Sequence, residues 1–290
     1  MQTPEADAAL PPARHRCSPR RRNQWAVTCV DDRGYKSLLA PFLGSLISVA
    51  GWRGRIAVFD YGLSAARVAR LRELGIHVEP VEQQHLLMVD RFIHLTQFAK
   101  QNEGVIGMWD ADVWFTEAVD DLFDTYREKH GGRLLCNWDA VFQTSCYDPA
   151  HDLATRKRID RVLLPLLREH GTVPQCGFLC GTTAVLARFG GYLAHLLARG
   201  EFALDWNSDT LGLCYFYTHH RRHIEVIDSR YNCLPDCYPA RLGDSFYFQG
   251  RRMRALHVTS PWRASRRGAK YRFQNIYPNL HEKWRETLGL

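Results

Sequence analysis

The sequence has no run that approaches about 18 consecutive apolar residues, so a transmembrane helix is not expected. Residues 1–22 are rich in Pro, Ala and Arg and lack the apolar core of a secretory signal peptide. We therefore expect a cytoplasmic protein. The apolar fraction of 46% and the charged fraction of 24% are ordinary for a soluble globular chain, and 290 residues can bury a sizeable core.

Several common motifs are also missing. The nine cysteines form no paired C-x2-C sets, which argues against a zinc ribbon or a disulfide framework, and we expect all nine to be reduced. Neither G-x-x-x-x-G-K-[ST] nor a G-x-G-x-x-G after the first strand is present, so two frequent phosphate loops are excluded. No helix-turn-helix or zinc finger is present, and nucleic acid is not an expected partner.

The net charge of +7 is concentrated in two places. The first cluster is Arg14, Arg16, Arg20, Arg21 and Arg22. Its composition predicts a disordered basic arm over residues 1–22. The second is Arg251, Arg252, Arg254, Arg263, Arg266, Arg267, Lys270 and Arg272. Basic clusters bind nucleic acid, anionic membranes or phosphate groups, and a pyrophosphate ligand is the simplest explanation here. We expect residues 266–290 to form a basic tail on or near the site, and peripheral membrane contact stays a hypothesis.

Hydrophobic patterning predicts alternating strands and helices. The predicted strands are 24–30, 55–59, 77–79, 104–109, 134–138, 177–181, 223–227 and 254–258. The predicted helices are 35–49, 64–74, 90–100, 156–169, 189–198 and 208–218. This alternation predicts an α/β fold with a mainly parallel central sheet flanked by helices. Without an internal repeat or a clear linker, residues 23–265 are predicted to form a single domain.

The triplet Asp110-Ala-Asp112 follows the apolar run 104–109 and precedes a second apolar run, 113–115. Buried carboxylates are costly unless they pair with a cation or bind a metal ion. Ligands of open α/β sheets bind at the carboxyl ends of the strands. We predict a functional site at this triplet. The alternative, two solvated loop aspartates of which one caps a turn, stays open.

Four pieces of sequence occur together in order. A strand ends in Asp31-Asp32 with Tyr35 nearby, followed by P-F-L-G-S-L at 41–46 and I-A-V-F-D-Y-G-L-S at 56–64. Arg91 then precedes the Asp110-Ala-Asp112 strand. Last come C-G-F-L-C-G at 176–181, N-S-D at 207–209, and His257 with Pro261-Trp262. In this order, roughly residues 24–265 resemble the GT-A (nucleotide-diphospho-sugar transferase) fold, especially family 8-like enzymes such as glycogenin and bacterial galactosyltransferases.

The resemblance implies a metal-dependent glycosyltransferase with a nucleotide-sugar donor, most simply a UDP-sugar. It implies that Asp110, Asp112 and His257 bind Mn²⁺ or Mg²⁺. A hard divalent cation neutralises the charge that grows on the diphosphate as the sugar leaves. Oxygen ligands with one imidazole suit Mn²⁺. The alternative is that His257 is an ordinary surface or core histidine.

The resemblance also implies residues that bind the donor. Asp31, Asp32 and Tyr35 match the place where the nucleotide base is held, although Asp32 can equally cap the next helix. Arg91 matches an arginine that contacts the donor in the resembling enzymes. The alternative role for Arg91 is a salt bridge on the protein surface.

Two further positions are expected to touch the donor. Gly177 matches a segment where small residues let the backbone approach the donor sugar, and close packing is its alternative. The resemblance also implies a basic residue near the C-terminus that binds the diphosphate, and Lys270 is one candidate. The sequence does not distinguish it from three others: Arg263, Arg266 and Arg267.

Asp209 and Asp205 are the candidates for the catalytic carboxylate, and a helix cap is the alternative role for Asp209. The resembling enzymes have an Asp followed by Gln, whereas here Thr210 follows Asp209. The missing Gln weakens the case for a retaining mechanism, so the stereochemistry stays open.

Rival functions remain for this pattern. A haloacid-dehalogenase-type phosphatase also uses a strand that ends in D-x-D, but normally on its first strand. A sugar nucleotidyltransferase opens with a Gly-rich basic loop, which residues 31–35 match poorly. A non-catalytic protein that binds a sugar or nucleotide is a third hypothesis. The acceptor is unknown: a saccharide, a lipid-linked sugar, a peptide and a small molecule all fit.

Overall fold

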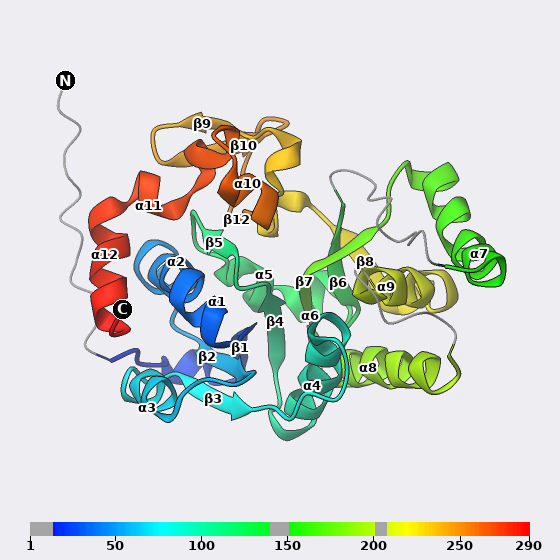
Figure 1. Cartoon of the computed structure of the whole chain (residues 1–290), viewed down its shortest axis with the longest axis horizontal. Coiled ribbons are helices and arrows are strands. Elements are labelled where there is room, and N and C mark those ends of the chain that lie inside the picture. The colour runs from blue at the N-terminus through cyan, green and yellow to red at the C-terminus, as the bar shows by residue number, and fades with distance from the viewer. Residues whose placement is uncertain (1–13, 140–150, 201–207) are drawn as a thin grey trace.

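The computed structural model describes residues 14–139, 151–200 and 208–290 (Figure 1). The strands are β1 (Gln24–Val30), β2 (Arg55–Asp60), β3 (His77–Pro80), β4 (Val105–Trp109), β5 (Val113–Phe115), β6 (Leu134–Trp138), β7 (Pro174–Thr182), β8 (Ile224–Ile227), β9 (Ala240–Leu242), β10 (Ser245–Phe248), β11 (Arg251–Arg252) and β12 (Ala255–His257). The α-helices are α1 (Asp32–Ser37), α2 (Leu39–Gly44), α3 (Ala65–Glu73), α4 (Leu87–Gln101), α5 (Asp120–Asp124), α6 (Tyr126–His130), α7 (Leu153–His170), α8 (Thr183–Ala198), α9 (Ser208–His219), α10 (Ser260–Ala264), α11 (Phe273–Ile276) and α12 (Pro278–Thr287). Shorter helical turns are η1 (Pro19–Arg21), η2 (Ser45–Val49), η4 (Arg221–His223), η5 (Ser229–Tyr231), η6 (Pro235–Cys237) and η7 (Arg267–Tyr271).

The central sheet has the strand order β3-β2-β1-β4-β7-β6-β8. Strands β3, β2, β1 and β4 pair in parallel, β7 runs antiparallel to both of its neighbours, and β8 is parallel to β6. The predicted mainly parallel sheet flanked by helices is therefore confirmed. The chain adds β2 and β3 on one side of β1 and then β4 on the other. A direction change of this kind opens a crevice at the carboxyl ends of β1 and β4.

Each face of the sheet packs on its own hydrophobic core. On β1, Trp25 and Val27 belong to the core shared with α4, α7, α8 and α9. Ala26 and Val30 face the opposite core, which is shared with α1, α2, α3 and α12. This alternation is the period of two that a strand imposes on its side chains. Figure 1 shows α8 and α9 on one side of the molecule and α2 and α12 on the other.

Two expectations about the chain need correction. Residues 14–22 of the predicted disordered arm are ordered: His15 Nε2 lies 2.8 Å from the carbonyl oxygen of Gly54, and Arg21 pairs with Asp120 and Asp124. The helix predicted over 35–49 is divided into α1, α2 and the π-helical turn η2, because the backbone leaves the helical conformation at Leu38.

Residues 266–290, predicted as a basic tail on or near the site, fold into η7, α11 and α12. Turn η7 packs on α10, whose Ser260 and Pro261 line the cavity described below, and α12 packs on α2. Trp284 of α12 lies over Gly44, where a Cβ atom would come within 2.8 Å of the indole ring. No residue of this segment lines the cavity itself, and its apolar side chains pack in the core. Among the described helices, none is both long and apolar enough to cross a lipid bilayer.

Candidate active site

Strand pairing brings the predicted metal ligands together. Asp110 follows β4, and Asp112 lies in the turn that leads into β5. Strand β12 pairs with β5 so that His257 lies opposite Val113, and the backbone N–H of Val258 donates to the carbonyl oxygen of Asp112 at 3.0 Å. One ligand atom from each of Asp110, Asp112 and His257 lies within 4.8 Å of the others. Two carboxylates and an imidazole are donors that Mn²⁺ accepts, so this set fits the expected cation.

Asp112 is held on both of its carboxylate oxygens. Nε2 of His257 lies 3.0 Å from Oδ1, and Nη1 of Arg263 donates to Oδ2 at 2.5 Å. Burial alone would raise the pKa of Asp112, but His257 and Arg263 outweigh it and lower this pKa to about 2. Burial also disfavours the charged form of His257 and would lower its pKa, yet Asp112 and then Asp110 raise this pKa above the ordinary value. The carboxylate of Asp112 is therefore ionised throughout the neutral range.

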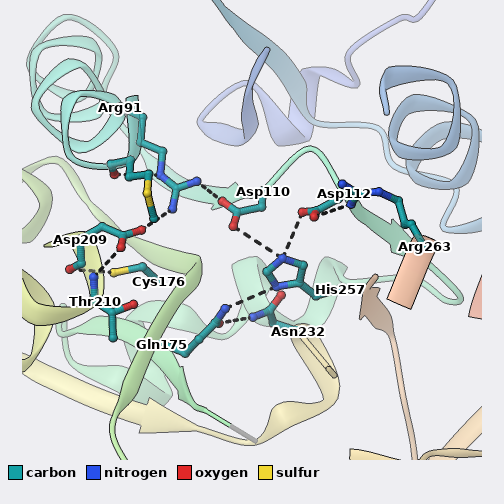
Figure 2. A network of polar contacts seen from close by, with 11 residues as sticks. Arg91, Asp110, Asp112, Gln175, Cys176, Asp209, Thr210, Asn232, His257 and Arg263 are labelled. Carbon is teal, nitrogen blue, oxygen red and sulfur yellow. Dashed lines mark hydrogen bonds and ion pairs between the residues drawn. The ribbon is translucent and has the colours of Figure 1, made fainter. Parts of the chain in front are cut away.

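Arg91 joins the metal cluster to Asp209. From α4, its guanidinium forms ion pairs with Asp110 and with Oδ2 of Asp209, the latter at 2.9 Å (Figure 2). Burial opposes the charge on Arg91, but Asp110 and Asp209 raise its pKa. Burial raises the pKa of Asp209, against the effect of Arg91. Arg91 is 6% exposed, so the solvent-exposed salt bridge that the sequence left open is excluded.

These groups line a cavity of about 620 Å³ at the carboxyl ends of β1 and β4. The β1 end contributes Val30 and Asp31, and α4 contributes Leu87, Met88 and Arg91. Because β7 is antiparallel, its first residues reach the same edge of the sheet, and Gln175, Cys176 and Gly177 line the cavity too. His257, Thr259, Ser260 and Pro261 close another side. This volume is typical of sites for small molecules and cofactors.

The three residues predicted to hold the nucleotide base have separate positions. Asp31 is exposed, lines the cavity, and accepts a hydrogen bond from the N–H of Gly34 at 2.6 Å as the cap of α1. Asp32 pairs with Arg67 and does not line the cavity. Tyr35 is fully buried and donates to the carbonyl oxygen of Leu288 at 2.8 Å. The structure thus brings only Asp31 of these three to the cavity, because α1 turns Tyr35 into the core.

Gly177 lines the cavity, but its bare face is covered by His257. A Cβ atom at this position would lie 2.4 Å from Cε1 and 2.5 Å from Nδ1 of the imidazole. Lys270 is exposed, with its amine 4.8 Å from the centre of the Tyr271 ring, and it does not line the cavity. Among the basic residues that the sequence left as rivals, Arg263 is the one bonded to the acidic pair. Asp205 lies outside the described residues.

Sequence reasoning did not find Gln175 and Asn232. Nε2 of Gln175 lies 3.4 Å from Nδ1 of His257, and Nδ2 of Asn232 donates to Oε1 of Gln175 at 2.6 Å. One signal was available: Gln175 is two positions before Gly177 on one strand, so both point to the same face. No comparable signal marked Asn232, which lies in a loop.

No model of a protein family and no curated protein sequence matches the chain. Solved structures do resemble it. The galactosyltransferase LgtC in complex with donor and acceptor sugar analogues matches with a TM-score of 0.55 and 16% identity, over 91% of this chain and 95% of that one. The bifunctional glycosyltransferase WbbM, in its apo structure, matches with a TM-score of 0.55 and 12% identity, over 99% of this chain and 50% of that one. Mouse xyloside xylosyltransferase 1 in its apo form gives a TM-score of 0.49 and 9% identity, over 82% of this chain and 98% of that one.

The chain therefore has the GT-A glycosyltransferase fold, as the sequence predicted, and the expected likeness to family 8-like enzymes fits LgtC. At these identities the likeness defines the fold, and the activity has to be argued from the site.

Proposed function

We propose that this protein is a metal-dependent glycosyltransferase that moves a sugar from a nucleotide-diphosphate sugar, with UDP as the nucleotide, to an acceptor hydroxyl. One observation carries the proposal. Asp110, Asp112 and His257 converge within a 620 Å³ cavity at the carboxyl ends of β1 and β4, in a GT-A fold.

When the bond between the sugar and the diphosphate breaks, negative charge grows on the diphosphate, and a positive charge beside it stabilises this leaving group. Asp110, Asp112 and His257 would hold Mn²⁺ or Mg²⁺, and the cation supplies the charge that stabilises the leaving group. Arg263 is a second source of charge. Its guanidinium is anchored by bonds to the carbonyl oxygen of Val258 at 2.7 Å and to Oγ of Ser260 at 2.9 Å. We assign the diphosphate contact to Arg263 in place of Lys270, because Arg263 lies beside the acidic pair.

Asp209 is the proposed carboxylate next to the transferred sugar. It is buried and lines the cavity, and Arg91 and the N–H of Thr210 hold its two oxygens at 2.9 Å and 2.7 Å. This fixed orientation suits a group that positions the donor sugar. A role as the base that deprotonates the acceptor is the alternative. NMR detection of the product anomer separates a retaining from an inverting enzyme, and Asp205 stays a rival for the base.

The deciding experiment is a thermal-shift panel of nucleoside diphosphates with and without Mn²⁺. A ligand that binds the folded state raises the melting temperature by mass action. We expect UDP to raise it only when Mn²⁺ is present, and the double variant D110A/D112A to lose the response. A response to UDP that does not depend on Mn²⁺ would contradict the metal role.

Two assays separate the rival functions. Metal-dependent hydrolysis of UDP-sugars by the wild type, absent from D110A/D112A, supports transfer over simple binding. Hydrolysis of an aryl phosphate would favour a phosphatase. The resembling solved structures are glycosyltransferases, which favours the transfer hypothesis.

A further inference from the structure

A pair of amide side chains lies directly behind His257. Figure 2 shows the amide of Gln175 between two partners, the imidazole and the amide of Asn232, on the side of the ring away from the acidic pair. The contacts are Nε2 of Gln175 to Nδ1 of His257 at 3.4 Å and Nδ2 of Asn232 to Oε1 of Gln175 at 2.6 Å. Asn232 is 2% exposed, and its Oδ1 has no hydrogen-bond partner among residues 14–139, 151–200 and 208–290. A buried acceptor without a partner costs free energy unless another arrangement satisfies it.

The surroundings leave the imidazole little freedom. The backbone N–H of His257 donates to the carbonyl oxygen of Cys233 at 2.9 Å, and β12 is paired with β5. A Cβ atom on Gly177 would lie within 2.7 Å of both the ring of His257 and Nε2 of Gln175. The glycine thus provides the space in which ring and amide meet. With the ring fixed, the remaining variable is which ring nitrogen carries the proton.

The two ring nitrogens have different tasks. Nε2 faces the acidic pair, 3.0 Å from Asp112 and 3.6 Å from Asp110, so Nε2 must offer its lone pair to a cation held there. The proton of the neutral ring must then be on Nδ1, and metal-binding histidines usually donate that N–H to a second side chain or carbonyl. In the structure an amide nitrogen faces Nδ1. That arrangement suits the other tautomer, in which Nε2–H donates to Asp112.

We propose that Gln175 and Asn232 form an amide relay that sets the tautomer of His257. When both amides turn by half a revolution, Oε1 of Gln175 accepts the proton of Nδ1, and Nε2 of Gln175 donates to Oδ1 of Asn232. Oδ1 of Asn232 then becomes the acceptor, and Nδ2 takes the position that Oδ1 now occupies. The oxygen and nitrogen ends of an amide have nearly the same shape, so the turn leaves the packing unchanged. Gln175 is a positioning residue for His257, and this inference rests on the proposed metal-dependent function.

The test is isothermal titration calorimetry of the 290-residue chain with Mn²⁺ alone. Gln175→Met keeps the length of the side chain but removes the acceptor, and we expect it to weaken Mn²⁺ binding roughly 10–100-fold. Gln175→Glu restores an acceptor for Nδ1–H and is expected to bind at least as tightly as the wild type. The matched control is Gln97→Met, because Oε1 of Gln97 lies 3.1 Å from Nδ1 of His94 in an exposed Gln–His contact of the same kind.

A spectroscopic readout separates the relay from simple structural support. With ¹⁵N-labelled histidine and diamagnetic Zn²⁺, the wild type is expected to show a protonated Nδ1 at His257, a signal absent from His257→Gln. If Gln175→Met fails to fold, Gln175→Glu still decides, since binding more than about tenfold weaker than the wild type would overturn the relay. Equal Mn²⁺ affinity in Gln175→Met and the wild type would overturn the relay alone. Absence of Mn²⁺ binding by the wild type would overturn the relay together with the metal role.

Discussion

Nη2 of Arg91 lies 2.9 Å from Oδ2 of Asp209, although the two residues are 118 positions apart in the sequence. The same guanidinium is paired with Asp110. One buried cation therefore couples the predicted metal cluster on β4 to the predicted sugar-facing carboxylate on α9. Neither acid is fully solvated, and both carboxylates have the Arg91 guanidinium as a close cationic partner.

Arg91→Leu is expected to lower the free energy of unfolding by about 3–5 kcal/mol, because removal of one partner leaves buried charge uncompensated. Urea denaturation measures the change. Asp209→Asn in the Arg91→Leu background should recover part of the loss, since it removes one orphaned carboxylate. The control is Lys36→Met, whose ion pair with Asp32 is exposed and is expected to matter little. A loss below about 1 kcal/mol for Arg91→Leu would show that this site is hydrated.

The affinity for Mn²⁺ is expected to rise with pH. Burial would lower the pKa of His257, but Asp112 and Asp110 outweigh it and raise this pKa above its ordinary value of 6.5. Below that pKa, the cation must displace a proton from the ring, so affinity falls about tenfold for each further pH unit. The stabilising contribution of protonated His257 has the opposite sign. It is fully present below pH 6.5 and is lost as the pH rises through the folded-state pKa.

Titration calorimetry between about pH 6 and 8.5, in buffers of different ionisation enthalpy, counts the protons released on Mn²⁺ binding. Asp112 does not contribute in this window, since its pKa is lowered to about 2. His257→Gln should bind weakly and without this pH dependence. An affinity in the wild type that is flat across the range would contradict the assignment of His257 as a ligand.

Arg263→Gln is expected to weaken UDP binding in the presence of Mn²⁺ by roughly 10–100-fold, the value of a hydrogen bond to a charged group. Arg263→Lys keeps the charge but loses the planar geometry and should recover only part of the affinity. Lys270→Gln is the matched control, because the Lys270 amine lies over the Tyr271 ring, whereas Arg263 is paired with Asp112. If Lys270→Gln weakened UDP binding and Arg263→Gln did not, the diphosphate contact would belong to Lys270 after all.

The sequence predicted the sheet well because its strands alternate with helices and end in acidic residues. It also predicted that His257 meets Asp110 and Asp112, but only through resemblance. These residues meet because β12 pairs with β5, and no local sequence pattern predicts that pairing. Asn232 was missed for the same reason, because its hydrogen bond to Gln175 leaves no spacing signal. Gln175 had one signal, its position two residues before Gly177 on the same strand.

The two chain ends show where composition misleads. The Arg-rich residues 14–22 have the charge of a disordered arm, yet His15 is buried and anchored to Gly54. Helix α12 and the residue that follows it are rich in charged side chains, but they also carry apolar residues at a spacing of four. These residues pack in the core: Leu280, Trp284 and Leu288. Net charge describes the exposed face of such a segment, whereas a few buried side chains decide whether it folds.

Trp284→Ala tests whether the C-terminal helix supports the fold or the cavity. Trp284 is 1% exposed, and truncation of a buried tryptophan should cost about 3–5 kcal/mol of unfolding free energy. Because residues 266–290 do not line the cavity, the folded variant should bind Mn²⁺ with the affinity of the wild type. Urea denaturation and titration calorimetry at low temperature measure the two quantities separately. Glu286→Ala, on the exposed side of α12, is the control for stability. A large loss of Mn²⁺ affinity in folded Trp284→Ala would mean that α12 reaches the site through α1, where Tyr35 is bonded to the carbonyl oxygen of Leu288.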